Sequence, residues 1–250
     1  MDIVFLGTGG GRINLIKQIR GTGGFRINSE TANIHVDPGP GALIASKKFR
    51  QDPLKLDCII VTHSHTDHIT DAQVMIEGMS GYALRRRGIF IGSRRSVAEL
   101  SEWHKGKIDN LVVLAPGEKK GFDTEKGHFD IEAYPVKHDE ETAFGFKIKM
   151  DGVVLGHITD SELTKNLGKD FSGCDCLIIN CIKPEPDQYA GHLTSDDVIE
   201  ILKVAKPKQA IITHMGLKML RFGPASEAKR IADATGVKVI AAKDGMKITL

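Results

Sequence analysis

The sequence predicts an α/β or α+β fold, and the order of its elements fits an αββα sandwich of two mixed β-sheets flanked by helices. Short runs of β-favouring residues recur along the whole chain. Several runs contain four or five consecutive apolar residues, as in strands that are covered on both faces. Helical patterns fall between these runs. The first half is expected to consist of strands joined in hairpins, whereas the second half repeats strand, loop and helix.

The expected strands are rich in Val, Ile and Phe, residue types that favour extended structure. No low-complexity segment or internal repeat interrupts the series. The strands are expected at residues 3–6, 32–36, 58–61, 89–91, 111–114, 129–136, 144–150, 153–155, 177–179, 210–213, 237–241 and 247–250.

The clearest helix is expected to begin at Thr194 and to run to about residue 205. The Thr194 hydroxyl can accept a hydrogen bond from the free amides of the first turn. Asp196 and Asp197 place negative charge at the positive end of the helix dipole. Pro207 ends the helix, because proline cannot continue it.

Two further helices are indicated by their terminal residues. One is expected at residues 96–105, with Ser93 or Ser96 as its N-cap. The other is expected at residues 224–234, with proline at its first position and Gly236 just beyond its end.

Length and composition indicate a single globular domain that spans residues 1–250. This length is near the upper size of one compact domain, and 41% hydrophobic with 26% charged residues is typical of a folded protein. The formal net charge of +2 is too small to indicate a polyanionic partner. The cysteines lack the paired spacing of a zinc site and are expected to be reduced. They are Cys58, Cys174, Cys176 and Cys181.

The beginning of the sequence carries no targeting signal. It starts directly with a strand and shows neither the basic region nor the cleavage site of a secretory leader. No apolar run approaches the roughly 18 residues needed to span a bilayer. We therefore expect a cytoplasmic protein with no membrane contact, and the sequence leaves the formation of a homodimer open.

The most informative motif follows the apolar run at residues 58–61. His63, His65, Asp67 and His68 lie within six residues, and imidazole and carboxylate are ligands that borderline divalent metals prefer. In an extended turn, His63 and His65 point the same way and can share one metal, while Asp67 and His68 can reach a second metal beside it. The alternative is a solvated polar loop, but the buried strand before it argues against that.

Three more candidate ligands come at the ends of other apolar runs. They are His138, Asp160 and His214. The carboxyl edge of a sheet is where open α/β folds usually place their sites. The repeated placement therefore predicts that these side chains converge on the histidine motif.

With these later residues in order, the segment 62–68 resembles the H-x-H-x-D-H motif of the metallo-β-lactamase superfamily. The glycine-rich segment after Phe5 and the segment Val36-Asp37-Pro38-Gly39 resemble its opening strand and its loop after the early sheet. The similarity extends from Phe5 to about Gly216, nearly the whole chain. It implies a metallo-β-lactamase-like fold.

The resemblance also implies two divalent metal ions, most simply zinc, with manganese or iron as alternatives. The first metal would be bound by His63, His65 and His138. The second metal would be bound by Asp67, His68 and His214. Asp160 would bridge the two. Asp37 would hydrogen-bond behind the ligand loop and orient an imidazole, or it would be only a turn aspartate.

The layout is nearest to the ribonuclease Z-like and cyclic-phosphate phosphodiesterase branch, which begins with a similar FLGTGGG-type strand. That branch carries an extra histidine between the bridging aspartate and the last ligand, and His192 falls in this window. The resemblance implies that His192 is catalytic and contacts the scissile phosphate without binding metal. The alternative is an exposed histidine that only caps a helix. Asp67 is the other catalytic candidate, as a ligand that also orients water or accepts a proton.

One departure weakens the transfer of the substrate. The tRNA-processing ribonucleases of this branch carry a long Gly- and Pro-rich arm between the fourth histidine and the bridging aspartate. Here only residues 139–159 separate these positions, and they are expected to form two strands with a turn at Asp151-Gly152. We therefore do not expect tRNA as a substrate, and a small anionic phosphodiester is the better expectation.

Several other segments allow two interpretations. The glycine-rich segment 7–24 could form a lid over the metals, or its amides could cradle phosphate. Residues 85–95 hold five arginines and could form a solvated face or an anion-attracting lip. His35 and His157 are expected to be packed strand residues, with support behind the metals as an alternative for His157.

The sequence therefore indicates a metal-dependent hydrolase in which a hydroxide held between two metals attacks a small phosphodiester. A thioester or lactone hydrolase of the glyoxalase II-like type uses the same nucleophile and is the first alternative. A non-catalytic metal or ligand sensor is the second, and the complete set of candidate ligands argues against it.

Overall fold

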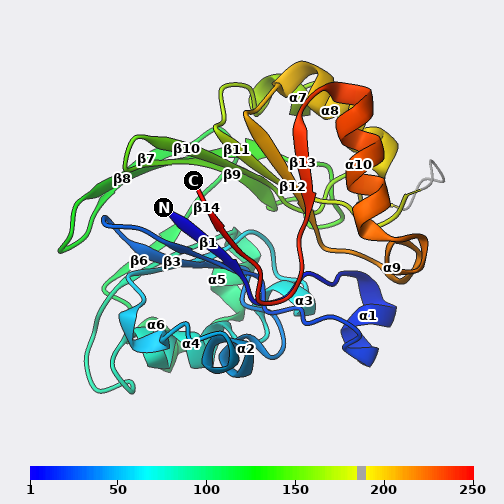
Figure 1. The fold of residues 1–250 in the computed structure, drawn as a ribbon. Coiled ribbons are helices and arrows are strands. Elements are labelled where there is room, and N and C mark those ends of the chain that lie inside the picture. Colours follow the sequence, from blue (N-terminus) through cyan, green and yellow to red (C-terminus); the bar gives the residue numbers. More distant parts are fainter. Residues whose placement is uncertain (185–189) are drawn as a thin grey trace.

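The two predicted sheets lie face to face, with helices on the outer side of each (Figure 1). The computed structural model describes residues 1–184 and 190–250. Within these residues each sheet has seven strands. Both sheets are mixed, because each combines parallel and antiparallel strand pairs. The predicted αββα sandwich is therefore confirmed.

The first sheet comes from the N-terminal half of the chain, and the last strand of the chain completes one edge. Its strand order is β14-β1-β2-β3-β4-β5-β6. The strands from β3 to β6 run parallel, whereas the pairs β14–β1, β1–β2 and β2–β3 are antiparallel. The strands are β1 (Asp2–Phe5), β2 (Phe25–Asn28), β3 (Asn33–Val36), β4 (Cys58–Val61), β5 (Ile89–Gly92), β6 (Asn110–Val113) and β14 (Lys247–Thr249).

The second sheet has the order β13-β12-β11-β10-β9-β8-β7. The strands from β7 to β10 form an antiparallel meander, and those from β10 to β13 are parallel. Asp151 and Gly152 take φ values of 52° and 76° in the predicted turn between β9 and β10. The strands are β7 (Lys119–Asp123), β8 (His128–Pro135), β9 (Phe144–Met150), β10 (Val153–Ile158), β11 (Cys176–Asn180), β12 (Gln209–Thr213) and β13 (Lys238–Ala241).

Helices cover the outer face of each sheet. In Figure 1, α2, α4 and α6 lie below the first sheet, and α7, α8 and α10 lie beside the second. A short 3-10 helix covers Pro53–Lys55. The helices are α1 (Gly11–Lys17), α2 (Ala42–Lys48), α3 (Thr66–Ile69), α4 (Ala72–Met79), α5 (Arg94–Glu99), α6 (Glu102–Lys105), α7 (Leu167–Asp170), α8 (Ser195–Ala205), α9 (Leu217–Phe222) and α10 (Pro224–Thr235).

The central core fills the space between the sheets. Alternate residues of paired strands point into it, such as Ile27 and Ile34 from the first sheet and Phe146 and Ile148 from the second, all fully buried. Burying each such side chain contributes roughly 1.5–3 kcal/mol. Two smaller apolar clusters attach the outer helices to the sheets. The rigid sandwich therefore holds the strand ends in fixed positions.

The predicted helix termini at α8 and α10 are confirmed. The Thr194 hydroxyl accepts from the Asp197 amide, and the Asp197 carboxylate accepts from the Thr194 amide, which is a capping box. Gly236 follows α10 with a φ of 71°, where glycine avoids the strain that a side chain would meet.

The helix expected at residues 96–105 is wrong as one element. Leu100 leaves helical geometry, with φ −70° and ψ 134°, and its buried side chain joins the apolar cluster on the outer face of the first sheet. Ser93 caps the helix before it and Ser101 caps the helix after it. The helix is therefore interrupted at Leu100, whose side chain is buried in this cluster.

The expected hairpins of the first half are confirmed only in part. β2 and β3 form an antiparallel hairpin, and β1 pairs antiparallel with β2. The connections between β3, β4, β5 and β6 contain helices, and further hairpins lie between β7 and β10. β2 and β7 were not expected. β2 includes the charged but fully buried Arg26, and β7 contributes only Phe122 to the core, so neither has an apolar run.

Two further expectations concern covalent and membrane features. The four cysteines are buried and free, as predicted. In the part of the chain that the structure describes, every helix is too short or too polar to cross a membrane.

Candidate functional site

The candidate ligands lie at one edge of the sandwich, where strands of both sheets end. β4 leads into His63, β8 into His138, β10 into Asp160 and β12 into His214. Parallel pairing brings the carboxyl ends of β10, β11 and β12 to the same edge. The helix α3 (Thr66–Ile69) follows the first two histidines. The side chains therefore converge from segments far apart in the sequence.

His63, His65 and His138 form the first predicted trio, with ligand atoms within 4.8 Å of one another. His138 Nδ1 hydrogen-bonds the Gly191 carbonyl at 3.0 Å, which leaves its Nε2 3.1 Å from His65 Nδ1. Thr62 Oγ1 lies 3.1 Å from His63 Nδ1. Burial lowers the pKa of His63 well below its ordinary value. This imidazole is therefore neutral and can offer a lone pair.

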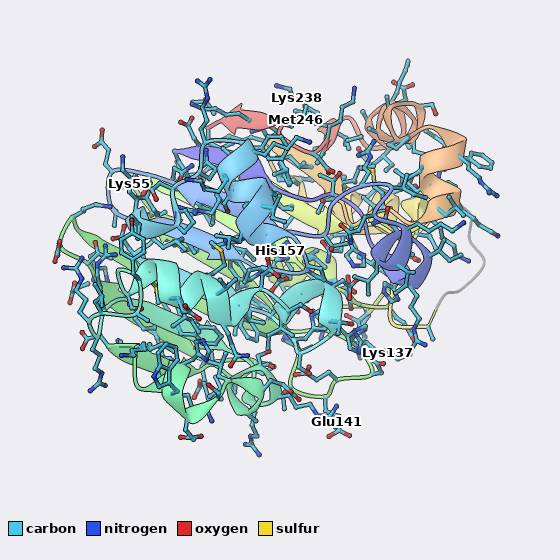
Figure 2. All side chains as sticks on the ribbon, turned by 90° about the horizontal axis from the view of Figure 1, so that it is seen from below. Lys55, Lys137, Glu141, His157, Lys238 and Met246 are labelled. Atoms are coloured by element: carbon cyan, nitrogen blue, oxygen red, sulfur yellow. The ribbon has the colours of Figure 1, made fainter. Side chains whose placement is uncertain are left out.

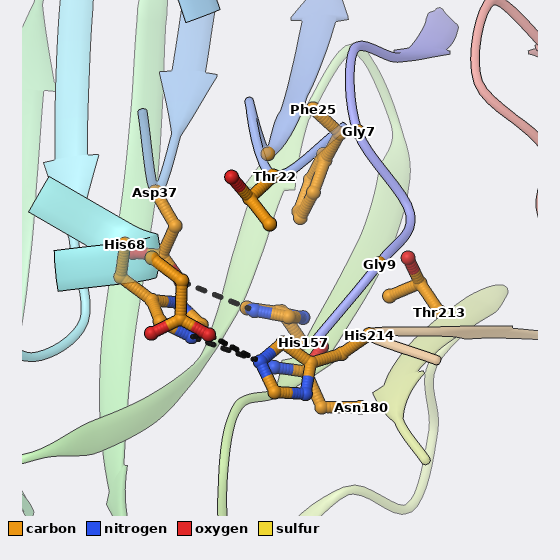
Figure 3. Close-up of a pocket in the computed structure, with 12 residues that line it drawn as sticks. Gly7, Gly9, Thr22, Phe25, Asp37, His68, His157, Asn180, Thr213 and His214 are labelled. Atoms are coloured by element: carbon orange, nitrogen blue, oxygen red, sulfur yellow. Dashed lines mark hydrogen bonds and ion pairs between the residues drawn. The ribbon is translucent and has the colours of Figure 1, made fainter. Parts of the chain in front are cut away.

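Asp67, His68 and His214 form the second predicted trio, again with ligand atoms within 4.8 Å. His68 Nδ1 donates to Asp37 Oδ2 at 3.0 Å, so its Nε2 is directed toward His214 Nε2, 3.2 Å away. His214 Nε2 also lies 3.3 Å from Asp67 Oδ2. Figure 3 shows His68 and His214 facing each other across this contact.

Asp160 lies between the two trios, where a bridging ligand was predicted. Its Oδ2 is 3.9 Å from His63 Nε2 and 3.4 Å from His68 Nε2, and its Oδ1 is 3.3 Å from His214 Nδ1. Asn180 Nδ2 donates to Oδ1 at 2.8 Å. Burial alone would raise the pKa of Asp160, but neighbouring histidines, His214 foremost, lower it well below its ordinary value. The carboxylate is therefore ionised.

The donor atoms fit bound cations. Two nitrogen–nitrogen contacts, of 3.1 and 3.2 Å, bring ring lone pairs together, which is unfavourable unless a proton or a cation lies between them. Among the described residues, His63 Nε2 and Asp160 Oδ2 are buried without a hydrogen bond. Burial alone would lower the pKa of His68, but Asp160 and Asp67 raise it well above its ordinary value. The carboxylates of Asp160 and Asp67 thus favour a positive charge near His68.

The hydrogen bonds predicted for Asp37 behind the ligand loop are present. Its carboxylate accepts from the Thr62 amide at 2.7 Å and from the Thr62 hydroxyl at 2.8 Å. His157 Nε2 lies 3.8 Å from Asp37 Oδ2, and its ring packs against Phe25 and Phe146. His157 is thus both a packed residue and a neighbour of the site, in the interior of the molecule (Figures 2 and 3).

Glu140 supports the same loop, and no pattern in the sequence indicates this role. Its buried carboxylate accepts from the Ser64 amide at 2.5 Å, from Ser93 Oγ at 2.6 Å and from Thr142 Oγ1 at 2.7 Å. Burial alone would raise the pKa of Glu140, but these hydrogen bonds lower it. Through Ser64 and Ser93, Glu140 therefore connects the loop of His63 and His65 with the end of β5.

Asp139 is a second residue that sequence reasoning missed. Its Oδ1 lies 3.1 Å from His138 Nε2 and 3.3 Å from His65 Nε2, and the side chain is largely exposed. Its position next to His138 in the sequence could have indicated it. Asn180 could also have been found, because it ends the apolar strand β11 at the edge where the ligands follow their strands.

The glycine-rich segment 7–24 packs against the site and does not cradle a ligand with its first amides. The amides of Gly7, Gly9 and Gly10 donate to carbonyls of the chain itself. A Cβ on Gly10 would lie 2.2 Å from His214 Nδ1, so only glycine lets the chain pass this close to the imidazole. The phosphate-cradle alternative is therefore wrong for these amides, and a lid stays a prediction.

His192 lies close to the candidate ligands. Its Nε2 is 3.2 Å from Asp160 Oδ2, and its ring lies near those of His138 and His214. Its expected role, contact with the scissile phosphate without binding metal, stays a prediction. Its Nδ1 lies 2.9 Å from the Ala190 carbonyl, so Nε2 faces the site. The loop before it falls partly on residues 185–189, outside the described residues.

The basic stretch at residues 85–95 divides into two parts. Arg86 and Arg87 lie before β5, at the edge remote from the site, and donate to backbone carbonyls such as those of Ile108 and Met79. An anion-attracting lip is therefore wrong for this part. Arg94 follows β5 at the site's edge and is exposed.

Two mixed sheets between helices, with histidine and aspartate clusters that could hold metal at the shared strand ends, define a metal-dependent hydrolase of the metallo-β-lactamase fold. The beta-lactamase superfamily domain matches residues 32–215, more than half of the chain. The chain therefore belongs to the beta-lactamase superfamily.

Individual relatives agree with this assignment. The chain is 35% identical over 261 residues to an uncharacterized protein of Methanocaldococcus jannaschii, covering 100% of this chain and 95% of that protein. It is 25% identical over 224 residues to a UPF0173 metal-dependent hydrolase of Pelotomaculum thermopropionicum, covering 80% and 86%. The solved metallo-beta-lactamase fold protein YhfI from Bacillus subtilis is similar with a TM-score of 0.80 at 21% identity, covering 99% and 98%.

Proposed function

We propose that this hydrolase is a phosphodiesterase that acts on a small phosphodiester or short nucleotide. The observation that carries the proposal is His192, an eighth side chain at the site beyond the seven proposed ligands. Its Nε2 reaches to 3.2 Å from Asp160. The leaving oxygen of a phosphodiester develops negative charge, and a proton donor at this place stabilises it. Hydrolysis of a carbonyl substrate depends less on such a donor.

The proposed ligand sets are the two trios with Asp160 between them. Imidazole and carboxylate donors suit zinc, and manganese or iron are alternatives. Divalent cations bound there would supply a water of lowered pKa and would neutralise charge on the substrate oxygens.

The chain's own residues would then position the reactants. Asp67 has a side chain at the mouth of the second trio, and burial alone would raise its pKa, but His68 and His214 lower it. An ionised Asp67 can accept a hydrogen bond from the attacking water and so orient it. His192 would donate a proton or a hydrogen bond to the leaving oxygen. Asp37 and Glu140 would keep the ligand loop in place.

A panel of model substrates tests the proposal. We expect the zinc- or manganese-loaded protein to hydrolyse bis-p-nitrophenyl phosphate, and to do so with a higher kcat/KM than thioesters or lactones. Turnover of the esters alone would contradict the phosphodiesterase and favour the glyoxalase II-like alternative. Absence of turnover on every substrate with any metal would favour the sensor.

A further inference from the structure

The helix α1 (Gly11–Lys17) has its polar and apolar sides reversed. Asn14 is fully buried, whereas Ile13 is 55% exposed and Ile16 is 82% exposed. A helix on the surface of a globular protein normally buries its apolar residues and exposes its polar ones. The outer side of α1 therefore presents isoleucine to the surroundings of the protein.

Hydrogen bonds fix α1 in this orientation. Asn14 Nδ2 donates to the Arg20 carbonyl, and Asn14 Oδ1 accepts from the Arg20 amide, both at 3.0 Å. The Arg20 guanidinium donates in turn to the Ala242 carbonyl at 2.8 Å and to Thr8 Oγ1 at 3.0 Å. A rotation that buried Ile16 would break these bonds, so the exposure of the isoleucines belongs to the folded state.

The neighbouring helix α9 (Leu217–Phe222) extends the apolar surface. The two helices are in contact, and Ile13 and Leu217 line one open pocket between them. Phe222, at the end of α9, is 60% exposed, and Ile19, just after α1, is also exposed. Figure 1 shows α1 and α9 at the same side of the molecule. We call the exposed residues Ile13, Ile16, Ile19 and Phe222 the α1–α9 patch.

The charged residues around this patch all have the same sign. The segments 11–20 and 217–223 contain five cationic residues and no acidic residue. They are Arg12, Lys17, Arg20, Lys218 and Arg221. Arg12, Lys17 and Arg221 are exposed beside the apolar residues. The α1–α9 patch is therefore both apolar and positively charged.

This charge argues against a second copy of the chain as the partner. A two-fold symmetric dimer places the same surface of both subunits against itself. At the α1–α9 patch such a dimer would bring Arg12, Lys17 and Arg221 close to their own counterparts, and like charges repel. Charge complementarity requires an anionic partner instead.

Among anionic partners, the apolar residues favour lipid over nucleic acid. Unpaired bases stack on aromatic rings and on arginine planes, whereas three of the four patch residues are isoleucines, whose aliphatic side chains suit acyl chains. Large apolar side chains beside Lys and Arg are typical of surfaces that lie in the interface of an anionic membrane.

We infer that the α1–α9 patch docks on an anionic membrane surface, with Ile13 and Ile16 at the acyl boundary and Arg12 and Lys17 at the headgroup phosphates. The expectation of no membrane contact rested on the lack of a spanning run, and docking at the interface does not require one. The inference is independent of the proposed reaction, because it uses no residue of the proposed centre.

Sedimentation with lipid vesicles tests the inference. The full-length protein is mixed with vesicles of phosphatidylcholine alone, or of phosphatidylcholine with an equal amount of phosphatidylglycerol. We expect binding to the anionic vesicles to be roughly 10- to 100-fold stronger, because several cationic side chains contribute. Added salt should weaken this binding, since it screens the headgroup charge.

Two substitutions locate the binding in the patch. Ile16→Glu removes an apolar side chain from the lipid and adds a negative charge, so binding to anionic vesicles should fall roughly tenfold or more. Lys17→Glu should also weaken it. Val204→Glu and Lys206→Glu are the matched controls. Val204 is 57% exposed on α8, in the helix layer of the other sheet, and Lys206 is exposed just after α8, so both variants should bind as the wild type does.

Several results would overturn the inference. It is wrong if the wild-type protein shows no preference for anionic vesicles, or if Val204→Glu weakens binding as much as Ile16→Glu does. A dimer in light scattering that Ile16→Glu converts to a monomer would assign the patch to a second copy. Binding of single-stranded DNA that Lys17→Glu abolishes and Ile16→Glu preserves would assign it to nucleic acid. None of these measurements uses turnover, so the phosphodiesterase proposal stands or fails separately.

Discussion

Two imidazoles of the trios are oriented by a partner on one ring nitrogen. His68 donates to Asp37, and His138 is held by the Gly191 carbonyl. Such partners fix the tautomer and leave the other nitrogen free to bind metal. Asp37 itself takes a φ of 50° and His214 a φ of 58°. Left-handed backbone at non-glycine residues is strained, and these two examples, among eight such residues in the described chain, belong to the site.

A prediction at this scale concerns His192. Replacing it with Ala should lower turnover of a phosphodiester by roughly 10²- to 10⁴-fold, the range for a positioned acid, while the protein retains its metal. Metal content and turnover are measured on one preparation. His128→Ala is the control, because His128 is exposed and its ring nitrogens contact carboxylates of its own hairpin.

The short distance between His192 and Asp160 gives this experiment a second outcome. If the His192→Ala protein loses metal together with activity, His192 is a ligand and the proposed division of roles is wrong. If it keeps both metal and full activity, His192 only precedes a helix, and the phosphodiesterase proposal loses its main support.

The candidate ligands were predictable because each follows an apolar strand, which is a pattern in the sequence. Glu140 has no such pattern. Its role depends on the fold bringing Ser64 and Ser93 to its two carboxylate oxygens, and these residues are distant in the chain. The proximity of His192 to Asp160 likewise depends on the path of the loop before α8, which no local signal determines.

At the scale of elements, the helix α8 illustrates how local signals position the site. Thr194, its N-cap, follows the segment that contains Gly191 and His192, and the Thr194–Asp197 capping box fixes where the helix begins. Gly191 has a φ of 74° and contacts His138. The position at which this helix begins therefore determines where His192 lies and where Gly191 contacts His138.

Replacing Thr194 with Ala should reduce the free energy of unfolding by about 1 kcal/mol, the usual cost of losing a helix cap. Urea denaturation of the metal-free protein measures this change. Ser101→Ala is the matched control, because Ser101 caps the short and exposed α6, whose loss should cost less. Equal effects of the two substitutions would contradict the role given to the capping box.

Elements with strong internal patterns were predicted well, and those that depend on their neighbours were not. β4 and β9 have the predicted bounds, since their apolar runs end at clear boundaries. β2 contains the buried Arg26, and the β7 strand is an edge strand with a single core residue. Their extended conformation comes from pairing with β1, β3 and β8, which their own sequences do not specify.

At the scale of the whole molecule, the site exists only where the two sheets meet. His63 and His68 belong to the first sheet's edge, whereas His138, Asp160 and His214 belong to the second. Cations bound by the two trios would therefore connect the first sheet with the second. In Figure 1 the N- and C-terminal strands lie side by side, and β14 pairs with β1, so the last strand of the chain completes the first sheet.

The central claim is that this enzyme works through metal held by the two trios, and metal titration tests it most directly. Metal-free protein is titrated with Zn²⁺, and bound metal per chain and hydrolysis of bis-p-nitrophenyl phosphate are followed together. We predict no hydrolysis without metal, binding of two ions per chain and return of activity with them, and loss of binding in His68→Ala but not in His128→Ala. Full hydrolysis by metal-free protein in the presence of chelator, or failure of the wild-type protein to bind any ion, would contradict the account.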